Sequence, residues 1–353
     1  MSLLSENLRF DYLQQWRGIA IILVVLTHTT HHGMSPDIGI QFLDNFIWFG
    51  ARGVTLFFVL SSFTIFYSIE GKLKSENNNY TNFLIRRFFR IAPLYYLGIL
   101  IYKFYYFHNP TLDFNLFLNI IFLNWLSPHA IDSSVPGGWS ISTEFTFYFF
   151  APLLFIRIKN INSATTVFLA SMLISRVCIA ILTKVYPAAG GVYYTLNPLC
   201  QFPVFILGIM LYFVLIKKEK ISLSTTDYLL ISTVVLLENL LGFILRDFYL
   251  YGIMFSILIY LTSKRPLPTF IGKPLSLIGE LSFTIYILHF LIKWTLRDLQ
   301  IIDPSSNSFI SFLIRFLGTL GITVLASIPI YFFLERPMMQ WGRILTQKRT
   351  KNK

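Results

Sequence analysis

The sequence predicts an all-α fold: a polytopic membrane helix bundle of about ten transmembrane helices with one short re-entrant or interfacial helix. Of its 353 residues, 55% are hydrophobic and 13% are charged, whereas a soluble domain carries about 25% charged residues. The mean hydropathy is +0.62. Apolar windows of about 20 residues, the length that crosses ~30 Å of hydrocarbon, recur along the whole chain. These observations favour lipid over water as the solvent of the fold.

Ten windows share this length and a low content of charged side chains. They lie at 15–34, 50–69, 91–108, 139–158, 164–184, 198–216, 226–245, 247–263, 275–295 and 309–334. An eleventh stretch, 112–126, is shorter and more polar, because Asp113, Asn115, Asn119 and Asn124 interrupt it. We expect this stretch to form the re-entrant or interfacial helix, with protein or water covering its polar side chains.

The positions of Lys and Arg predict the orientation of the spans, because cytoplasmic loops collect positive charge. With ten spans and a cytoplasmic N-terminus, the basic clusters at 72–90, 217–220 and 264–273 all lie on the cytoplasmic side. Counting the eleventh stretch as a further span would move the second and third clusters outside. We therefore expect ten spans, two cytoplasmic termini, and one membrane-embedded domain over 1–353 with a short basic tail from about 340.

Several classes of function are disfavoured by the composition. The net charge of +12 could suit nucleic acid, but the basic residues form short clusters between apolar windows, so we expect membrane lipids and no nucleic acid as partners. Cys178 and Cys200 lie inside apolar segments without ligand spacing, which predicts neither a disulfide framework nor a zinc site. His28, His31 and His32 could share a helix face, but no carboxylate or thiolate completes a ligand set, so no metal is expected.

Two ionisable residues of the first window are candidates for catalysis, because a charge at the bilayer centre costs at least ~2.5–3.5 kcal/mol. Arg17 and His28 are eleven positions apart. At about 100° per residue, both lie on one helix face about 16 Å apart. An imidazole in a partly dry site suits general-base chemistry, which makes His28 the candidate base. Arg17 has an alternative role as a snorkelling anchor near the cytoplasmic end of the span.

Glu144 is the third catalytic candidate, and it follows a short polar block at the outer end of the fourth window. Its depth, about one and a half turns below the outer surface, is similar to that of His28. A carboxylate at this depth can orient an imidazole or contact a substrate hydroxyl. Alternatively, Glu144 complements the helix dipole near the N-terminus of the span, with Ser140 as the cap.

Arg86, Arg87 and Arg90 form a cluster on the predicted cytoplasmic side, with Phe88 and Phe89 between them. Planar guanidinium groups within one and a half helical turns suit phosphate binding. The alternative is an ordinary positive-inside flank or a contact for anionic lipid. The other polar residues expected within the membrane are Arg176, Glu238, Glu280, His289, Arg315 and Glu335.

Five blocks of the sequence occur in a recognisable order. The first is Arg17, ten further residues and then His28. The other four are Gly53–Ser61, Arg86–Pro93, Trp139–Glu144, and Ser282–His289 followed by Glu335–Pro337. In this order the blocks resemble those of the acyltransferase-3 family of integral membrane acyltransferases, whose signature is an Arg-x10-His spacing.

The resemblance implies transfer of an acyl group, with acetyl favoured, from acyl-CoA on the cytoplasmic side to a hydroxyl of a sugar. The implied acceptor is a lipid-linked or nascent polysaccharide of the cell surface, such as lipopolysaccharide or exopolysaccharide, and the implied location is the bacterial inner membrane. Acetyl-CoA is then a substrate, and no permanently bound cofactor is expected. Alternatives are acylation of a small molecule, transport or flipping of a lipid-linked sugar, and a structural role in polysaccharide assembly.

The resemblance also implies roles for the candidate residues. His28, oriented or assisted by Glu144 and with Arg17 on the same helix face, would remove a proton from the acceptor hydroxyl. The residues expected to bind acyl-CoA are Arg86, Arg87 and Arg90. Those expected to contact substrate are Trp139, Ser140 and Ser142.

Overall fold

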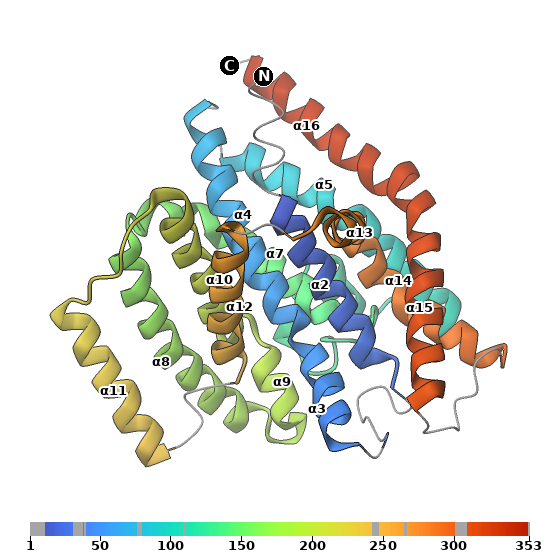
Figure 1. Ribbon diagram of the computed structural model, residues 1–353, viewed down its shortest axis with the longest axis horizontal. Coiled ribbons are helices and arrows are strands. Elements are labelled where there is room, and N and C mark those ends of the chain that lie inside the picture. The colour runs from blue at the N-terminus through green and yellow to red at the C-terminus, as the bar shows by residue number, and fades with distance from the viewer. Residues whose placement is uncertain are drawn as a thin grey trace.

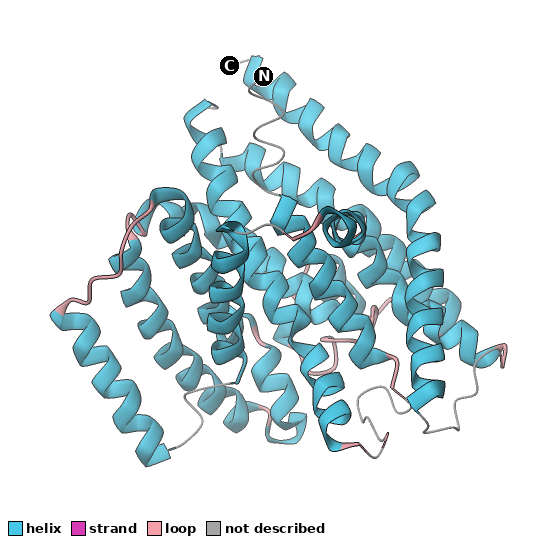
Figure 2. Cartoon of the chain, viewed as in Figure 1, coloured by secondary structure: helices cyan, strands magenta, loops and turns pink. Residues whose placement is uncertain are grey.

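The computed structural model describes residues 11–30, 38, 40–75, 80–108, 111–241, 247–264, 267–300 and 309–351. The regular structure within these residues is helical, with no β-strand (Figure 2). The α-helices are α2 (Asp11–His28), α3 (Gln41–Phe49), α4 (Gly53–Ser75), α5 (Tyr80–Ile99), α6 (Phe114–Ile120), α7 (Gly138–Arg157), α8 (Ile161–Val185), α9 (Gly190–Leu196), α10 (Pro198–Tyr212), α11 (Thr225–Leu241), α12 (Asp247–Lys264), α13 (Thr269–Glu280), α14 (Ser282–Asp298), α15 (Phe309–Ile330) and α16 (Arg336–Lys351). The 3₁₀ turns are η1 (Gly50–Arg52), η3 (Asn124–Leu126) and η4 (Pro187–Ala189), and the π-helical segments are η2 (Leu100–Tyr106), η5 (Phe213–Lys217) and η6 (Tyr331–Glu335).

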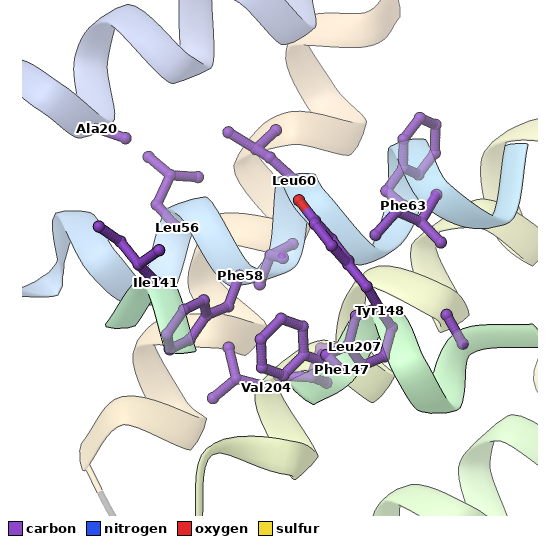
Figure 3. Close-up of a cluster of buried hydrophobic side chains, with 14 of the residues drawn as sticks. Ala20, Leu56, Phe58, Leu60, Phe63, Ile141, Phe147, Tyr148, Val204 and Leu207 are labelled. Carbon is purple, nitrogen blue, oxygen red and sulfur yellow. The ribbon is translucent and has the colours of Figure 1, made fainter. Parts of the chain in front are cut away.

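α4 lies near the centre of the bundle (Figure 1), where α2, α7, α10 and α12 pack against it. A helix with apolar residues on all sides needs such neighbours. Phe205 of α10 stacks on Phe58 of α4 and on Phe147 of α7, with ring centroids 4.6 and 4.3 Å apart. Figure 3 shows Phe58 and Phe147 in this cluster with Val204 and Leu207 of α10. The aromatic contacts fix α7 relative to both α4 and α10.

The backbones of α2 and α13 come very close where the two helices cross. A Cβ on Gly18 of α2 would lie 2.2 Å from the carbonyl oxygen of Leu275. A Cβ on Gly279 of α13 would lie 1.9 Å from the carbonyl oxygen of Gln14. Both distances are shorter than any van der Waals contact, so only glycine fits. Because helices in lipid associate through close packing of small residues, this crossing fixes the position of α2 and of its candidate catalytic residues.

Five helical stretches of the described chain are long and apolar enough to cross a membrane, and one bent helix pair would make a sixth. They are Gln41–Gly71, Gly138–Arg157, Ile161–Val185, Pro187–Lys217 and Phe309–Arg349. Each overlaps a predicted window. The other windows fall on helices that are shorter or more polar, so the structure confirms an all-helical fold with several apolar helices, while the count of ten spans stays a prediction.

Three predicted segments can be compared with the structure in detail. The window 275–295 is not one straight helix, because the chain bends by 75° between α13 and α14. The predicted tail from about 340 belongs to α16, which follows α15 through η6 and packs along α5. The stretch 112–126 holds the seven-residue α6 and the turn η3. About 10 Å of helix cannot cross ~30 Å of hydrocarbon, in agreement with the expectation that this stretch does not span.

Candidate functional site

Three neighbouring cavities share wall residues. We name them the arginine cavity, around Arg86, Arg87, Arg90 and Arg343, the glutamate pocket, around Arg17 and Glu144, and the histidine cavity, around His28 and Asp132. Arg90 lines the first two cavities, and Val54 and Tyr286 line the second and third. The cavities therefore form a series from the arginine cluster of α5 to His28 at the end of α2.

The arginine cavity measures about 190 Å³, and among the described residues no acidic one lines it. α5 brings Arg86, Arg87 and Arg90 together, as their spacing predicts, and α16 adds Arg343. The guanidinium carbon of Arg87 lies 5.3 Å from the ring centroid of Phe83, which helps to hold it in place. Four guanidinium groups around one cavity can bind several phosphate groups. The sequence alone does not single out Arg343, because this residue belongs to the basic C-terminal stretch.

In the glutamate pocket, the carboxylate of Glu144 accepts two hydrogen bonds. One comes from Ser61 Oγ of α4 and the other from the hydroxyl of Tyr148, one turn further along α7, each at 2.5 Å. Arg17 of α2 and Arg90 of α5 line the same pocket. Four helices thus converge on a carboxylate that is hydrogen-bonded to two hydroxyls and has two guanidinium groups nearby.

The structure does not bring Glu144 to His28, in contrast to the expected pairing. Glu144 lines the glutamate pocket and not the histidine cavity, whereas Trp139 lines the histidine cavity and not the glutamate pocket. Trp139 and Glu144 are five positions apart, which places their side chains about 140° apart around α7. The two residues therefore face different cavities.

The predicted substrate contacts of α7 also separate. Trp139 lines the histidine cavity and Ser140 lines the glutamate pocket, but Ser142 lines neither cavity and its side chain is fully buried. Ser142 is two positions, or about 200°, from Ser140 on the helix. It therefore faces the interior packing of the bundle in this structure, and the substrate contact expected of Ser142 stays a prediction.

Tyr286 stands between the glutamate pocket and the histidine cavity and lines both. Its hydroxyl donates to the carbonyl oxygen of Gly137 at 2.9 Å and lies 2.8 Å from Ser140 Oγ. Gly137 has a φ of +74°, and a Cβ there would lie 2.5 Å from the Tyr286 hydroxyl. A glycine is therefore needed at this turn. The hydrogen bonds of Tyr286 join α14 to the first turn of α7.

The histidine cavity measures about 490 Å³, within the range of small-molecule sites. His28 lines it with Trp139 and Trp294, whose rings offer flat apolar faces, and with the amide of Gln201. Lys293 of α14 adds a cationic group. This mixture of aromatic faces and a few polar groups suits a polar organic ligand with apolar ring faces.

Asp132 also lines the histidine cavity, from the connection between η3 and α7, outside the helices that can span a membrane. Asp132 is exposed, although the protein around its carboxyl group removes part of its hydration. Desolvation raises the pKa of Asp132 to about 7, although the backbone N–H groups of Trp139 and Gly137 oppose this rise. The carboxyl group can therefore change charge near neutral pH.

The ring of His28 contacts a second histidine. Its Nδ1 lies 3.1 Å from Nε2 of His289 in α14, and Nδ1 of His289 lies 2.7 Å from the carbonyl oxygen of Tyr286. The ring of Phe290 packs on both imidazoles, with centroid distances of 4.5 Å to His28 and 4.3 Å to His289. The sequence places His289 inside a window and at the end of the Ser282–His289 block. It gives no sign of the contact with His28, because the two histidines are 261 positions apart.

Within the described residues, no group of three or more His, Cys, Asp or Glu side chains could hold a metal ion. His31 and His32 of the histidine trio lie outside the described residues, as does the side chain of Glu238.

Comparisons with known proteins agree on one type of chemistry. The acyltransferase domain Acyl_transf_3 matches residues 10–332. "Acyltransferase MdmB" of Streptomyces mycarofaciens is 27% identical over 194 residues, which are 52% of this chain and 49% of that protein. "Putative acetyltransferase ORF330" of Acidianus two-tailed virus is 31% identical over 109 residues, 30% of this chain and 31% of that protein. The chain thus spans half or less of the length of these relatives. No solved structure matches it significantly.

Proposed function

Because the chain belongs to the acyltransferase-3 family, whose match covers residues 10–332, we propose that it moves an acyl group, in the first instance acetyl, from acyl-CoA to a hydroxyl of a sugar. The observation that supports this most strongly is the cavity series, which has a cluster of guanidinium groups at one end and an imidazole at the other. We further propose a surface or exported polysaccharide as acceptor and the bacterial inner membrane as location, with the arginine cavity facing the cytoplasm.

The arginine cavity supports acyl-CoA as the donor. The nucleotide end of acyl-CoA carries several phosphate groups, and it needs cations in a place that a cytosolic molecule can reach. Arg86, Arg87, Arg90 and Arg343 supply such cations, and no carboxylate from the described part of the chain lines the cavity to compete for them. In this arrangement the guanidinium groups bind phosphates through charge-assisted hydrogen bonds.

The thioester arm of the donor then extends through the glutamate pocket towards His28. The arm contains amide groups, which need hydrogen-bond partners once they leave water. Arg17, Ser140 and Glu144 provide donors and acceptors in the wall of this pocket. Tyr286 and Val54, which line both this pocket and the next, mark the point where the thioester meets the acceptor.

In the histidine cavity the acyl group passes from sulfur to oxygen. A ring nitrogen of His28 removes the proton of the acceptor hydroxyl as its oxygen attacks the thioester carbonyl. The new C–O bond forms, the C–S bond breaks, and the proton passes from the imidazolium to the departing thiolate of CoA. General-base catalysis of this kind contributes about 10²- to 10⁴-fold to a rate.

The lining of the histidine cavity supports a sugar as the acceptor. Sugar rings have apolar faces that can stack on indole rings such as those of Trp139 and Trp294, and hydroxyl groups that can bind to Asp132 and Gln201. With a volume of about 490 Å³, the cavity is large enough for one sugar unit at a time rather than for a whole chain.

The test is a transfer assay with radiolabelled acetyl-CoA on membranes that contain the wild-type chain or His28→Gln. The wild type should place the label in the glycan fraction, and His28→Gln should lower the rate by about 10²- to 10⁴-fold. His129→Gln is the matched control, because His129 is exposed and lines none of the three cavities. Equal rates for the wild type and His28→Gln would disprove the mechanism. Sugar translocation without any need for acetyl-CoA would instead identify a transporter.

A further inference from the structure

His289 lies on the buried side of α14 and has an exposed fraction of 1%. Within the described residues it forms no ion pair with a carboxylate, and the charged side chain one turn further along the helix, Lys293, is also cationic. A charged imidazole in this position would be buried without a counterion, which is costly. We therefore treat the ring of His289 as neutral.

The hydrogen bond of His289 to its own helix determines which nitrogen carries the proton. Nδ1 lies 2.7 Å from the carbonyl oxygen of Tyr286, and a carbonyl oxygen can only accept. Nδ1 of His289 must then be the protonated nitrogen. In a neutral imidazole the other nitrogen has a lone pair, so Nε2 of His289 is an acceptor.

Two acceptors are available to the ring of His28, namely Nε2 of His289 and the backbone carbonyl of Val24 one turn earlier on α2. Nε2 of His289 lies 3.1 Å from Nδ1 of His28, and a hydrogen bond between them requires that Nδ1 of His28 donates. Nε2 of His28 is then left with its lone pair, on a ring that lines the histidine cavity. This tautomer is assigned from the hydrogen-bond partners of the two rings.

Two contacts hold this arrangement in place. The ring of Phe290 packs on both imidazoles, which limits their rotation. The hydroxyl of Tyr286 donates to the carbonyl oxygen of Gly137, which fixes the turn of α14 whose carbonyl accepts from His289. The position of the proton on His28 is thus coupled to the docking of α14 against α7.

Building on the proposed function, we propose that His289 is a positioning residue that holds His28 in the tautomer with an unprotonated Nε2, the atom that accepts the proton of the acceptor hydroxyl. In the other tautomer, Nε2 would carry a hydrogen and could not act as a base. His289 itself does not touch the reacting atoms. The alternative is that the two histidines form a polar contact that only joins α2 to α14.

The direct test is ¹⁵N NMR of the purified full chain labelled at histidine. The chain has six histidines, and the signal lost in His28→Gln identifies His28. At neutral pH the wild type should show an unprotonated Nε2 and a protonated Nδ1 at His28. His289→Leu should give a mixture of tautomers, because it removes the side-chain acceptor and leaves only the backbone carbonyl of Val24. His289→Gln should restore the wild-type pattern, because its amide oxygen can accept from Nδ1. A protonated Nε2 at His28 in the wild type would overturn the proposal.

Kinetics separate a positioning role from a structural one. His289→Leu should lower kcat by at least about 10-fold, within the range of general-base catalysis, with little change in the KM for acetyl-CoA, and His289→Gln should recover most of the loss. The double variant His28→Gln/His289→Leu should be no slower than His28→Gln alone, because both changes act on the same base. A further loss in the double variant, or an unchanged kcat in His289→Leu, would contradict the proposal.

Failure of this proposal and failure of the proposed function give different results. If the wild type transfers no acetyl group, the proposed function fails, and the positioning role fails with it even where the NMR spectrum shows the expected tautomer. If the wild type transfers acetyl and His289→Leu keeps both its kcat and its His28 signals, the function stands and the role of His289 is disproved.

Discussion

Removing a guanidinium group from the arginine cavity should weaken the binding of acetyl-CoA by an amount that depends on burial. Arg87 is half-buried and lies over the rings of Phe83 and Tyr148. A hydrogen bond between charged groups in such a place is worth about 1.5–3 kcal/mol. Because about 1.36 kcal/mol corresponds to a factor of ten, Arg87→Gln should raise the KM for acetyl-CoA about 10- to 150-fold.

Arg343 lines the same cavity but is exposed on α16. Exposed ion pairs are worth about 0.2–1 kcal/mol, so Arg343→Gln should raise the KM only about 1.5- to 5-fold. Arg157→Gln is the matched control, because Arg157 is exposed at the end of α7 and lines none of the three cavities. Its KM should equal that of the wild type.

The assay compares initial rates with two donors, acetyl-CoA and S-acetylpantetheine, which lacks the nucleotide and its phosphates. If the guanidinium groups bind phosphate, Arg87→Gln and Arg343→Gln should resemble the wild type when S-acetylpantetheine is the donor. An equal loss with both donors would show that Arg87 acts on the fold or on the chemistry instead. An unchanged KM for acetyl-CoA in Arg87→Gln would refute phosphate binding by the arginine cavity.

Three further predictions concern the other cavities. Glu144→Gln should lower kcat/KM at least about 10-fold in the transfer assay, because it removes a carboxylate that accepts two hydroxyl hydrogen bonds and lies in one pocket with Arg17 and Arg90. Wild-type activity in Glu144→Gln would exclude a role for the negative charge of Glu144. Because desolvation raises the pKa of Asp132 to about 7, its carboxylate forms as the pH rises from about 6 to about 8. The transfer rate at limiting acceptor should rise over the same pH range, and Asp132→Asn should abolish this rise. An unaltered pH profile in Asp132→Asn would assign the rise to another group. Gly137→Ala should lower the unfolding temperature, because alanine at a φ of +74° costs about 1–2 kcal/mol and its Cβ would lie 2.5 Å from the Tyr286 hydroxyl. Gly191→Ala is the control and should change the unfolding temperature little, because its Cβ would have no atom within 4 Å. Equal unfolding temperatures for Gly137→Ala and the wild type would show that the turn tolerates a side chain.

Hydropathy along the sequence predicted the helical class because a membrane helix must satisfy its own backbone and bury about 20 apolar residues. The distribution of Lys and Arg argued against a span at the short, polar stretch 112–126, where α6 has only seven residues. Hydropathy did not predict the bend between α13 and α14, because the residues on both sides of Leu281 together are apolar enough to form one window. A hydropathy window measures composition and not direction, so a 75° change of direction leaves no signal in it.

The candidate site was predictable where its members share one helix. Arg86, Arg87 and Arg90 lie on α5, so helical geometry alone groups them around one cavity. Arg17 and His28 share α2 but line neighbouring cavities. Contacts between distant segments were not predictable from one sequence. Depth in the membrane suggested that Glu144 meets His28, but depth leaves the rotation of α7 undetermined, and that rotation turns Glu144 towards Ser61 and Tyr148.

His289 and Arg343 illustrate the same limit. His289 reaches His28 from α14, which lies 261 positions away in the sequence. Arg343 joins the arginine cavity because α16 packs back along α5. Neither contact follows from local periodicity, because both depend on how separate helices dock.

In the proposed mechanism, a donor bound at the arginine cavity delivers its acyl group to an acceptor at His28. This transfer can be tested with sealed membrane vesicles of both orientations, supplied with radiolabelled acetyl-CoA that cannot cross the membrane. We expect label in the glycan only when acetyl-CoA is on the side of the arginine cavity, and only when His28 is intact. Label that enters the glycan from the opposite side, or that enters equally well in His28→Gln vesicles, would contradict the account.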